Sequence, residues 1–310
     1  MLEVIDLRKV FKDNVAVNDV NMYLGRGESV GLVGPNGAGK STTIAMISTL
    51  IRPTSGDVKL NGTSVLVDPA PMRAELGVVP QEVALYPELS AQENLEFFGS
   101  LYGLRGKDLA AAVDDALELV GLSDRRKDVI KKYSGGMKRR INIAAALLHN
   151  PEFVIMDEPT VGIDPQSRNH ILETVRTLNR ERGLTVLYTS HYMEEVEQLC
   201  DRIYVMDHGK VIASGTNNEI KAILAADNTI LLQIESRNAG LETRLAALPA
   251  VRQVTQTDDG LKLITSHDNG VLSEVFKAAE AEGAVISSLG VQKPSLEDVF
   301  LHLTGRSLVD

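Results

Sequence analysis

The sequence is poor in cysteine and in aromatic residues. Its 310 residues include one cysteine, no tryptophan and 4% aromatic side chains. A single cysteine excludes a disulfide within the chain, and with it the disulfide-rich class of small secreted domains. Nothing in the sequence around Cys200 suggests an activating base, so we expect this thiol to be a small core residue rather than a nucleophile.

Long apolar runs and an excess of positive charge are also missing. No uninterrupted apolar run approaches the ~18 residues that span a bilayer, and residues 1–6 lack the basic-then-apolar order of a signal peptide. The formal net charge of −10 argues against nucleic acid or anionic lipid as a general partner, and we expect no nucleic-acid partner. Length and a hydrophobic content of 44% predict a globular chain with one large and one small domain.

One segment departs from this acidic balance. Between Asp124 and Arg140, two acidic residues stand against eight basic ones: Arg125, Arg126, Lys127, Lys131, Lys132, Lys138, Arg139 and Arg140. Two interpretations stay open at this point. The segment is either a solvated helix face or a patch that raises the potential where phosphate groups arrive.

Residues 1–225 alternate between strand and helix patterns. Strands are expected at residues 2–7, 20–24, 29–33, 58–60, 153–156, 185–189 and 203–206. Helices are expected at residues 41–51, 93–102, 109–120, 137–148, 166–182 and 193–200. Buried apolar strands that alternate with helices predict an α/β domain built on a mostly parallel sheet. The helical stretch at about residues 86–150 is expected to form a subdomain of its own.

The remaining residues, 226–310, follow a different pattern. Strand, helix, strand, strand, helix and strand are expected in that order over residues 229–289, which is the α+β ferredoxin-like arrangement. A last helix is expected to begin after Ser295, a plausible N-cap. No cluster of reactive side chains stands out here, so we hypothesise a small accessory domain with a regulatory or dimer-stabilising role.

A phosphate-binding loop follows the expected strand at residues 29–33. Its residues are Gly34, Pro35, Asn36, Gly37, Ala38, Gly39, Lys40, Ser41 and Thr42. Glycines let backbone N–H groups turn toward phosphate oxygens, and the N-terminus of the following helix adds partial positive charge. We expect Lys40 to reach the β- and γ-phosphates and the Ser41 hydroxyl to bind Mg²⁺.

Three further segments supply side chains for hydrolysis. Asp157 and Glu158 end a buried strand, where we expect Asp157 to hold Mg²⁺ and Glu158 to act as general base. Gln81 lies between the sheet and the helical stretch, where it could ligate Mg²⁺ and orient the attacking water. His191 follows another buried strand, whose carboxyl end faces the ligand crevice in such sheets. There it could hydrogen-bond the γ-phosphate.

A second glycine motif, Ser134-Gly135-Gly136, begins a helix. A helix-capping turn explains Ser134 alone but not the two glycines that follow it. An anion belongs at such a helix N-terminus, although the phosphate loop already serves one side of the nucleotide. A chain that carries both motifs is therefore expected to grip ATP from two sides.

These motifs, in this order, resemble the ATP-binding-cassette (ABC) ATPases, which are P-loop NTPases. The resemblance implies ATP and Mg²⁺ as cofactors. It also implies an ATP-dependent homodimer in which Ser134, Gly135 and Gly136 contact the γ-phosphate held by the second protomer. Three more roles come from the resemblance alone: adenine stacking by Phe11, lining of the same face by Ala16, and coupling of the two sites by Asp164.

Two departures from the commonest ABC signature narrow the resemblance. The signature has Tyr133 and Met137 where Leu and Gln are usual, which is similar to the branch of type-2 ABC exporters for drugs and lipids. This implies a motor subunit that drives a separate integral membrane permease, bound at the cytoplasmic face of the cell membrane. The exported compound is expected to be a drug, a lipid or another hydrophobic molecule.

Two other functions are compatible with an ATP-binding chain. A soluble ABC ATPase that acts on ribosomes or DNA is the alternative, but such proteins usually carry two cassettes or long coiled coils, and this chain has neither. A non-catalytic nucleotide sensor would require the loss of Glu158 or His191, and both residues are present.

Overall fold

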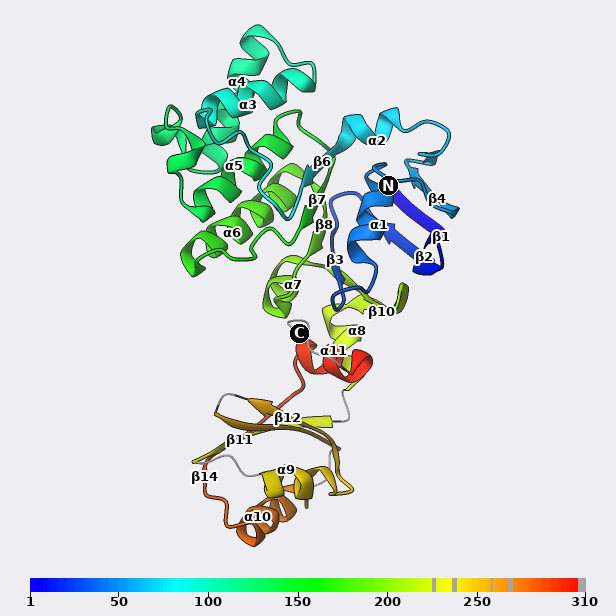
Figure 1. Ribbon diagram of the computed structural model, residues 1–310, viewed down its shortest axis with the longest axis vertical. Coiled ribbons are helices and arrows are strands. Elements are labelled where there is room, and N and C mark those ends of the chain that lie inside the picture. The colour runs from blue at the N-terminus through cyan, green and yellow to red at the C-terminus, as the bar shows by residue number, and fades with distance from the viewer. Residues whose placement is uncertain (225–226, 236–238, 258, 267–269, 306–310) are drawn as a thin grey trace. The chain divides into compact units, whose positions relative to one another are not determined.

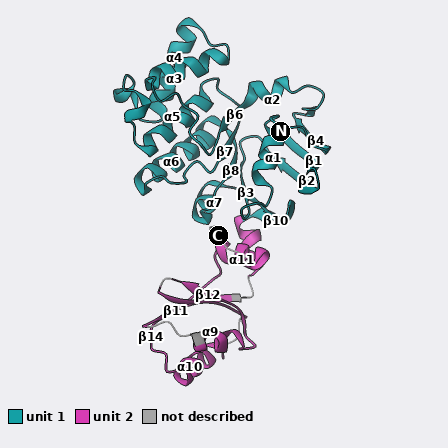
Figure 2. Cartoon of the chain, in the orientation of Figure 1, with its two compact units in different colours: residues 1–216, 308–310 teal, residues 217–307 magenta. Residues whose placement is uncertain are grey.

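The computed structural model describes residues 1–305 except 225–226, 236–238, 258 and 267–269. The chain divides into two compact units, with the boundary between Thr216 and Asn217 (Figures 1 and 2). The domain boundary that the sequence suggests, between residues 225 and 226, stays a prediction. Each unit is described by itself below.

Two sheets form the body of the first unit. The four-stranded antiparallel sheet has the order β2 (Asn14–Leu24), β1 (Leu2–Phe11), β4 (Ser55–Leu60) and β5 (Thr63–Ser64). The six-stranded sheet has the order β10 (Lys210–Thr216), β9 (Arg202–Asp207), β3 (Ser29–Val33), β8 (Thr185–Thr189), β7 (Phe153–Asp157) and β6 (Leu76–Val79). Only the β10–β9 pair in this second sheet is antiparallel. The mostly parallel sheet predicted from the sequence is therefore confirmed.

The centre of the parallel sheet is fully buried, which explains its apolar strands. Every residue of β3 and β8 is buried, and both strands have neighbours on two sides. The helices α1 (Lys40–Ile47), α2 (Ala70–Glu75), α6 (Pro165–Arg182) and α7 (Met193–Leu199) accompany these strands (Figure 1). Because the strands are parallel, their carboxyl ends meet at one edge, and the loops after β3, β6, β7 and β8 converge there.

Helix α1 is shorter than predicted. The expectation of a helix to residue 51 was wrong, because α1 ends at Ile47 with Ser48 as its C-cap. Thr49 has a φ of 62°, in the left-handed region, which an α-helix cannot continue through. The chain then turns directly toward β4.

The predicted helical subdomain is present and has its own core. It consists of α3 (Ala91–Leu101), α4 (Gly106–Leu119), α5 (Gly135–Leu147) and two short 3₁₀ helices, Ser123–Arg125 and Ile130–Lys132. A capping box between Ser90 and Glu93 starts α3. Leu95, Leu117 and Ile141, one from each helix, are fully buried together. Packing of these apolar faces is what holds the three helices as one body.

Three of the eight basic residues of the segment in this subdomain form ion pairs at the surface. Arg126 pairs with Asp114 at 2.6 Å, and Lys131 lies 3.5 Å from Glu88. Arg125 pairs with Asp128. These exposed pairs contribute little to stability. The interpretation as a solvated face therefore suits these three residues.

The second unit has the ferredoxin-like pattern that the sequence predicts. After α8 (Asn217–Ala222) it runs β11 (Asp227–Ile234), α9 (Ala239–Ala246), β12 (Val251–Thr257), β13 (Gly260–Ser266), α10 (Val271–Ala281), β14 (Ile286–Gln292) and α11 (Leu296–Thr304). The strand order is β12-β13-β11-β14, with all neighbours antiparallel. The N-cap predicted at Ser295 is confirmed, within a capping box that Asp298 completes. Asp298 also forms a buried ion pair with Lys262, which ties α11 to the sheet.

The burial of Cys200 gives a first prediction. Cys200 is 5% exposed, and burial raises the pKa of its thiol to about 12 from an ordinary value of 9.0. A shift of three pH units leaves roughly 1,000-fold less thiolate at neutral pH, and the thiolate is the reactive form. We expect a disulfide reagent at pH 8 to label the native chain at least ~100-fold more slowly than the chain unfolded in guanidinium. Equal rates before and after unfolding would contradict the core placement.

Candidate functional site

The phosphate loop joins β3 to α1, and close packing explains two of its glycines. A Cβ atom on Gly34 would overlap the carbonyl oxygen of Met206. Gly39, the N-cap of α1, has a φ of 104°, and a Cβ atom there would lie 2.6 Å from the carbonyl oxygen of Ala16. Neither position accepts a side chain, so the loop is held close to β2 and β9.

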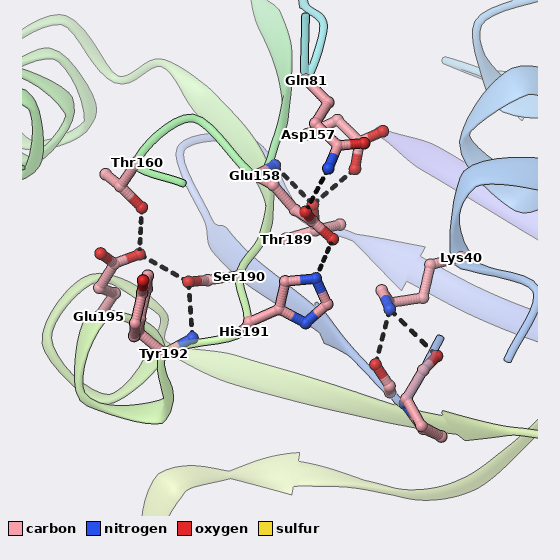
Figure 3. Close-up of polar contacts among 12 residues, drawn as sticks. Lys40, Gln81, Asp157, Glu158, Thr160, Thr189, Ser190, His191, Tyr192 and Glu195 are labelled. Carbon is pink, nitrogen blue, oxygen red and sulfur yellow. Dashed lines mark hydrogen bonds and ion pairs between the residues drawn. The ribbon is translucent and has the colours of Figure 1, made fainter. Parts of the chain in front are cut away.

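Lys40 is buried at the first position of α1. Its side-chain ammonium donates to the carbonyl oxygens of Gly34 at 2.6 Å and of Pro35 at 3.3 Å, so it lies folded over its own loop (Figure 3). Burial lowers the pKa of Lys40, while the charges of Glu158 and Asp157 oppose that shift. A buried cation at a helix N-terminus is the arrangement that binds phosphate groups.

A cavity of about 500 Å³ opens over this loop, which is within the usual size range of small-molecule sites. Eleven residues that the sequence singles out line it: Phe11, Ala16, Asn36, Gly37, Ala38, Gly39, Lys40, Ser41, Thr42, Gln81 and Glu158. Asn14, Val15, His208 and Gly209 complete the lining. Phe11 is 45% exposed, which excludes a core role for its ring.

Glu158 is the side chain on which the other loops converge (Figure 3). Its carboxylate accepts a hydrogen bond from Gln81 Nε2 at 2.8 Å and lies 2.7 Å from Nε2 of His191. Its backbone φ is 48°, a left-handed conformation that is costly for a residue with a side chain. The backbone N–H of Glu158 donates to Thr189 Oγ1 at 2.9 Å, and this bond stabilises the strained turn.

Thr189 and Arg139 support this site and were not identified from the sequence. Thr189 is fully buried on β8 and donates to Asp157 Oδ1 at 2.7 Å, so one hydroxyl fixes both acidic residues. Arg139 is 5% exposed on α5 and donates to the carbonyl oxygens of Pro80 at 2.8 Å and Gln81 at 2.5 Å. The helix that begins at the second glycine motif is thereby tied to the Gln81 loop.

The oxygen donors near the phosphate loop suit a hard cation. Ser41 offers a hydroxyl, Asp157 a carboxylate, and Gln81 the carbonyl oxygen of an amide whose NH₂ group already donates to Glu158. Magnesium prefers oxygen ligands and is usually held by few protein groups together with phosphates and water. The residues present therefore fit Mg²⁺ bound with a nucleotide.

The second glycine motif lies apart from this cavity. Ser134 caps α5 by accepting from the Met137 N–H at 3.2 Å, and none of Ser134, Gly135 and Gly136 lines the cavity. Gly136 instead packs against the N-terminus of α6, where a Cβ atom would overlap Ser167. Asp164, the N-cap of α6, is at the same place. The structure thus brings the motif together with Asp164 but not with the phosphate loop.

Comparison with known proteins agrees with this geometry. Residues 17–161 match the family described as ABC transporter, and residues 215–304 match the C-terminal domain of DrrA1-3-like ATP-binding proteins. The chain is 49% identical to the linearmycin resistance ATP-binding protein LnrL of Bacillus subtilis (strain 168), over 100% of both chains.

The chain belongs to the ABC transporter ATP-binding proteins.

Two further likenesses support this assignment. The daunorubicin resistance ATP-binding protein DrrA3 of Streptomyces coeruleorubidus is 38% identical over 96% of this chain and 93% of its own. A solved ATP-binding cassette, a dimer in a post-hydrolysis state with ADP and phosphate, is 27% identical with a TM-score of 0.64 and covers 70% of this chain and 98% of its own. As a member of this family the chain is an ATPase coupled to transport. Among the described residues, no helix is long and apolar enough to cross a membrane.

The two glycines of the ABC signature motif give the next prediction. Gly136→Ala is expected to lower the free energy of unfolding by about 1–3 kcal/mol, because its Cβ atom would lie 2.5 Å from Cβ of Ser167. Gly135→Ala meets nothing closer than Ile163 Cδ1 at 3.9 Å and should leave stability unchanged. Denaturant unfolding compares the two variants. Equal stability of both, or no recovery of Gly136→Ala by added Ser167→Gly, would contradict the close packing.

Proposed function

We propose that Glu158 is the general base of ATP hydrolysis and that Gln81 and His191 position it and the attacking water. One observation carries this proposal: the Glu158 carboxylate reaches the wall of the phosphate-loop cavity while it contacts both Gln81 and His191. A buried carboxylate fixed by two donors can accept a proton from water without a large reorganisation.

The remaining site residues bind the phosphate groups and the Mg²⁺ ion. Lys40 leaves its own loop carbonyls to pair with the β- and γ-phosphates, and the N–H groups of residues 34–42 face the phosphate oxygens. When ATP binds, the His191 N–H that faces Glu158 in this structure turns to the γ-phosphate, a contact typically worth ~3 kcal/mol of barrier when positioned. Ser41, Gln81 and Asp157 would hold Mg²⁺, and the bound ion would supply charge neutralisation at the phosphates.

We infer that two copies of the chain complete each other's sites. In one chain the signature residues Ser134, Gly135 and Gly136 do not reach the phosphate-loop cavity, although both elements suit phosphate. A head-to-tail dimer supplies the missing half from the partner, with Asp164 linking the two sites. Phe11, exposed at the end of β1, stacks on adenine, and Ala16 lines the same face.

We also propose a docking surface for a separate integral membrane permease, which holds the chain at the cytoplasmic face of the membrane. Tyr86, Phe97 and Phe98 form an aromatic cluster, with the rings of Tyr86 and Phe97 4.9 Å apart. Tyr86 and Phe97 are exposed, and Tyr86 follows the Gln81 loop. A permease that pushes on this cluster would therefore act on the segment that contacts Glu158.

The transported compound is expected to be a drug, a lipid or another hydrophobic molecule. Relatives that span nearly the whole chain carry names of resistance to linearmycin and daunorubicin, and this favours export over a role at the ribosome or on DNA. Substrate contacts would lie in the permease.

A conservative substitution tests the base. Glu158→Gln should lower ATP turnover by about 1,000-fold, because the amide cannot take a proton from water. ATP binding should persist, because Lys40 and the loop are untouched. Steady-state ATPase measurements and nucleotide-binding titration separate the two effects. Glu152→Gln, a half-exposed position before the same strand, is the control and should keep its turnover. Normal turnover in Glu158→Gln would remove the proposed mechanism.

Replacement of one aromatic ring by a charged side chain tests the docking surface. Phe97→Asp should reduce co-purification with the detergent-solubilised permease by at least ~10-fold, because a carboxylate cannot be buried at an apolar contact without a large cost. Val67→Asp is the control, since Val67 is 86% exposed and far from the cluster in sequence. Equal recovery of the permease with both variants would place the contact elsewhere.

A further inference from the structure

A buried carboxylate on α7 takes no part in the mechanism above. Glu195 is 2% exposed, and one of its oxygens, Oε2, accepts three hydroxyl hydrogen bonds. The donors are Thr160 Oγ1 at 2.8 Å, Tyr188 OH at 2.8 Å and Ser190 Oγ at 2.6 Å. Figure 3 shows Glu195 between Thr160 and Ser190. Burial of a carboxylate costs several kcal/mol, which charge-assisted hydrogen bonds of this number can offset.

Two of these donors belong to loops that carry site residues. Thr160 lies between Glu158 and Asp164, on the segment that leads to α6. Ser190 directly precedes His191, and its hydroxyl also accepts from the Tyr192 N–H at 2.9 Å. Ser190 and Tyr192, the two neighbours of His191 in the chain, are therefore hydrogen-bonded to each other. Ser190 is in turn hydrogen-bonded to Glu195.

The other oxygen of Glu195 faces α6. Its Oε1 atom lies 3.5 Å from Nε of Arg168, four residues after Asp164. The Arg168 guanidinium in turn stacks over the ring of Tyr192, 4.1 Å from its centroid. A second connection thus links the His191 loop to the helix that Asp164 caps. Glu195 thus contacts hydroxyl groups of the two loops through Oε2 and Arg168 of α6 through Oε1.

From this arrangement we propose that Glu195 is a positioning residue that makes the His191 loop and the Thr160–Asp164 segment move as one body. The proposal rests on the roles proposed above for His191 and Asp164, and adds the physical link between them. When the contact of His191 with the γ-phosphate changes, a shift of the His191 loop displaces Ser190 and, through Glu195, Thr160 and Arg168. It then reaches Asp164, which faces the second chain.

Two variants that each remove one hydroxyl from the same oxygen test the link. Thr160→Val removes the bond to the Asp164 segment, whereas Tyr188→Phe removes a bond from the middle of the sheet. Thr160→Val should lower kcat about ten-fold, lower the Hill coefficient for ATP and change KM by less than two-fold. Tyr188→Phe should change kcat and the Hill coefficient by less than two-fold, even where its thermal stability falls.

A double variant tests whether the hydroxyls act through Glu195 as a unit. Thr160→Val combined with Ser190→Ala should cost about as much kcat as the larger single change, because either one already breaks the connection. Glu195→Gln, which keeps an acceptor, should retain more activity than Glu195→Ala. Equal effects of Thr160→Val and Tyr188→Phe on kcat, or additive costs in the double variant, would overturn the proposal. Failure of the proposed base would instead appear in Glu158→Gln, which lies outside this network.

Discussion

The site depends on how the turn after β7 is held. Glu158 adopts a left-handed backbone conformation, and the Thr189 hydroxyl, one strand away, satisfies its N–H group while bonding Asp157. This arrangement requires β7 and β8 to be parallel neighbours in register, with Asp157 opposite Thr189. The strain is tolerated because β7 and β8 beneath it are buried, apart from the half-buried Asp157. The geometry of the proposed catalytic residues is therefore a consequence of sheet register.

Contacts then extend from this turn to the rest of the first unit. Gln81, after β6, and His191, after β8, both reach the Glu158 carboxylate, and Arg139 fixes the Gln81 loop from the helical subdomain. The helix that carries the signature motif is thus connected to the proposed base in the same chain. In the proposed head-to-tail dimer, that connection would link the site each protomer holds to the site it completes.

Motifs contiguous in sequence were predictable, and contacts between distant segments were not. The phosphate loop needs only neighbouring residues, so its pattern was sufficient. Most strands, the three-helix subdomain and the ferredoxin-like second unit followed from periodicity, but β6, β10 and the short helix α2 were not expected. The roles of Thr189 and Arg139 were not predicted, because their hydrogen-bond partners lie 31 and 58 positions away in the sequence. Each residue meets its partner only in the folded chain. The end of α1 was missed because a left-handed Thr49 has no sequence signal comparable to glycine.

ATP is proposed to bind between two copies of the chain. Two variants, Lys40→Met and Gly135→Asp, are prepared in a Glu158→Gln background, and retained labelled ATP is measured after gel filtration, separately and as a mixture. We expect little retention by either variant alone and about one ATP per two dimers in an equal mixture, because half the dimers then contain one intact composite site. Full retention by the Gly135→Asp chain alone, or no gain on mixing, would contradict it.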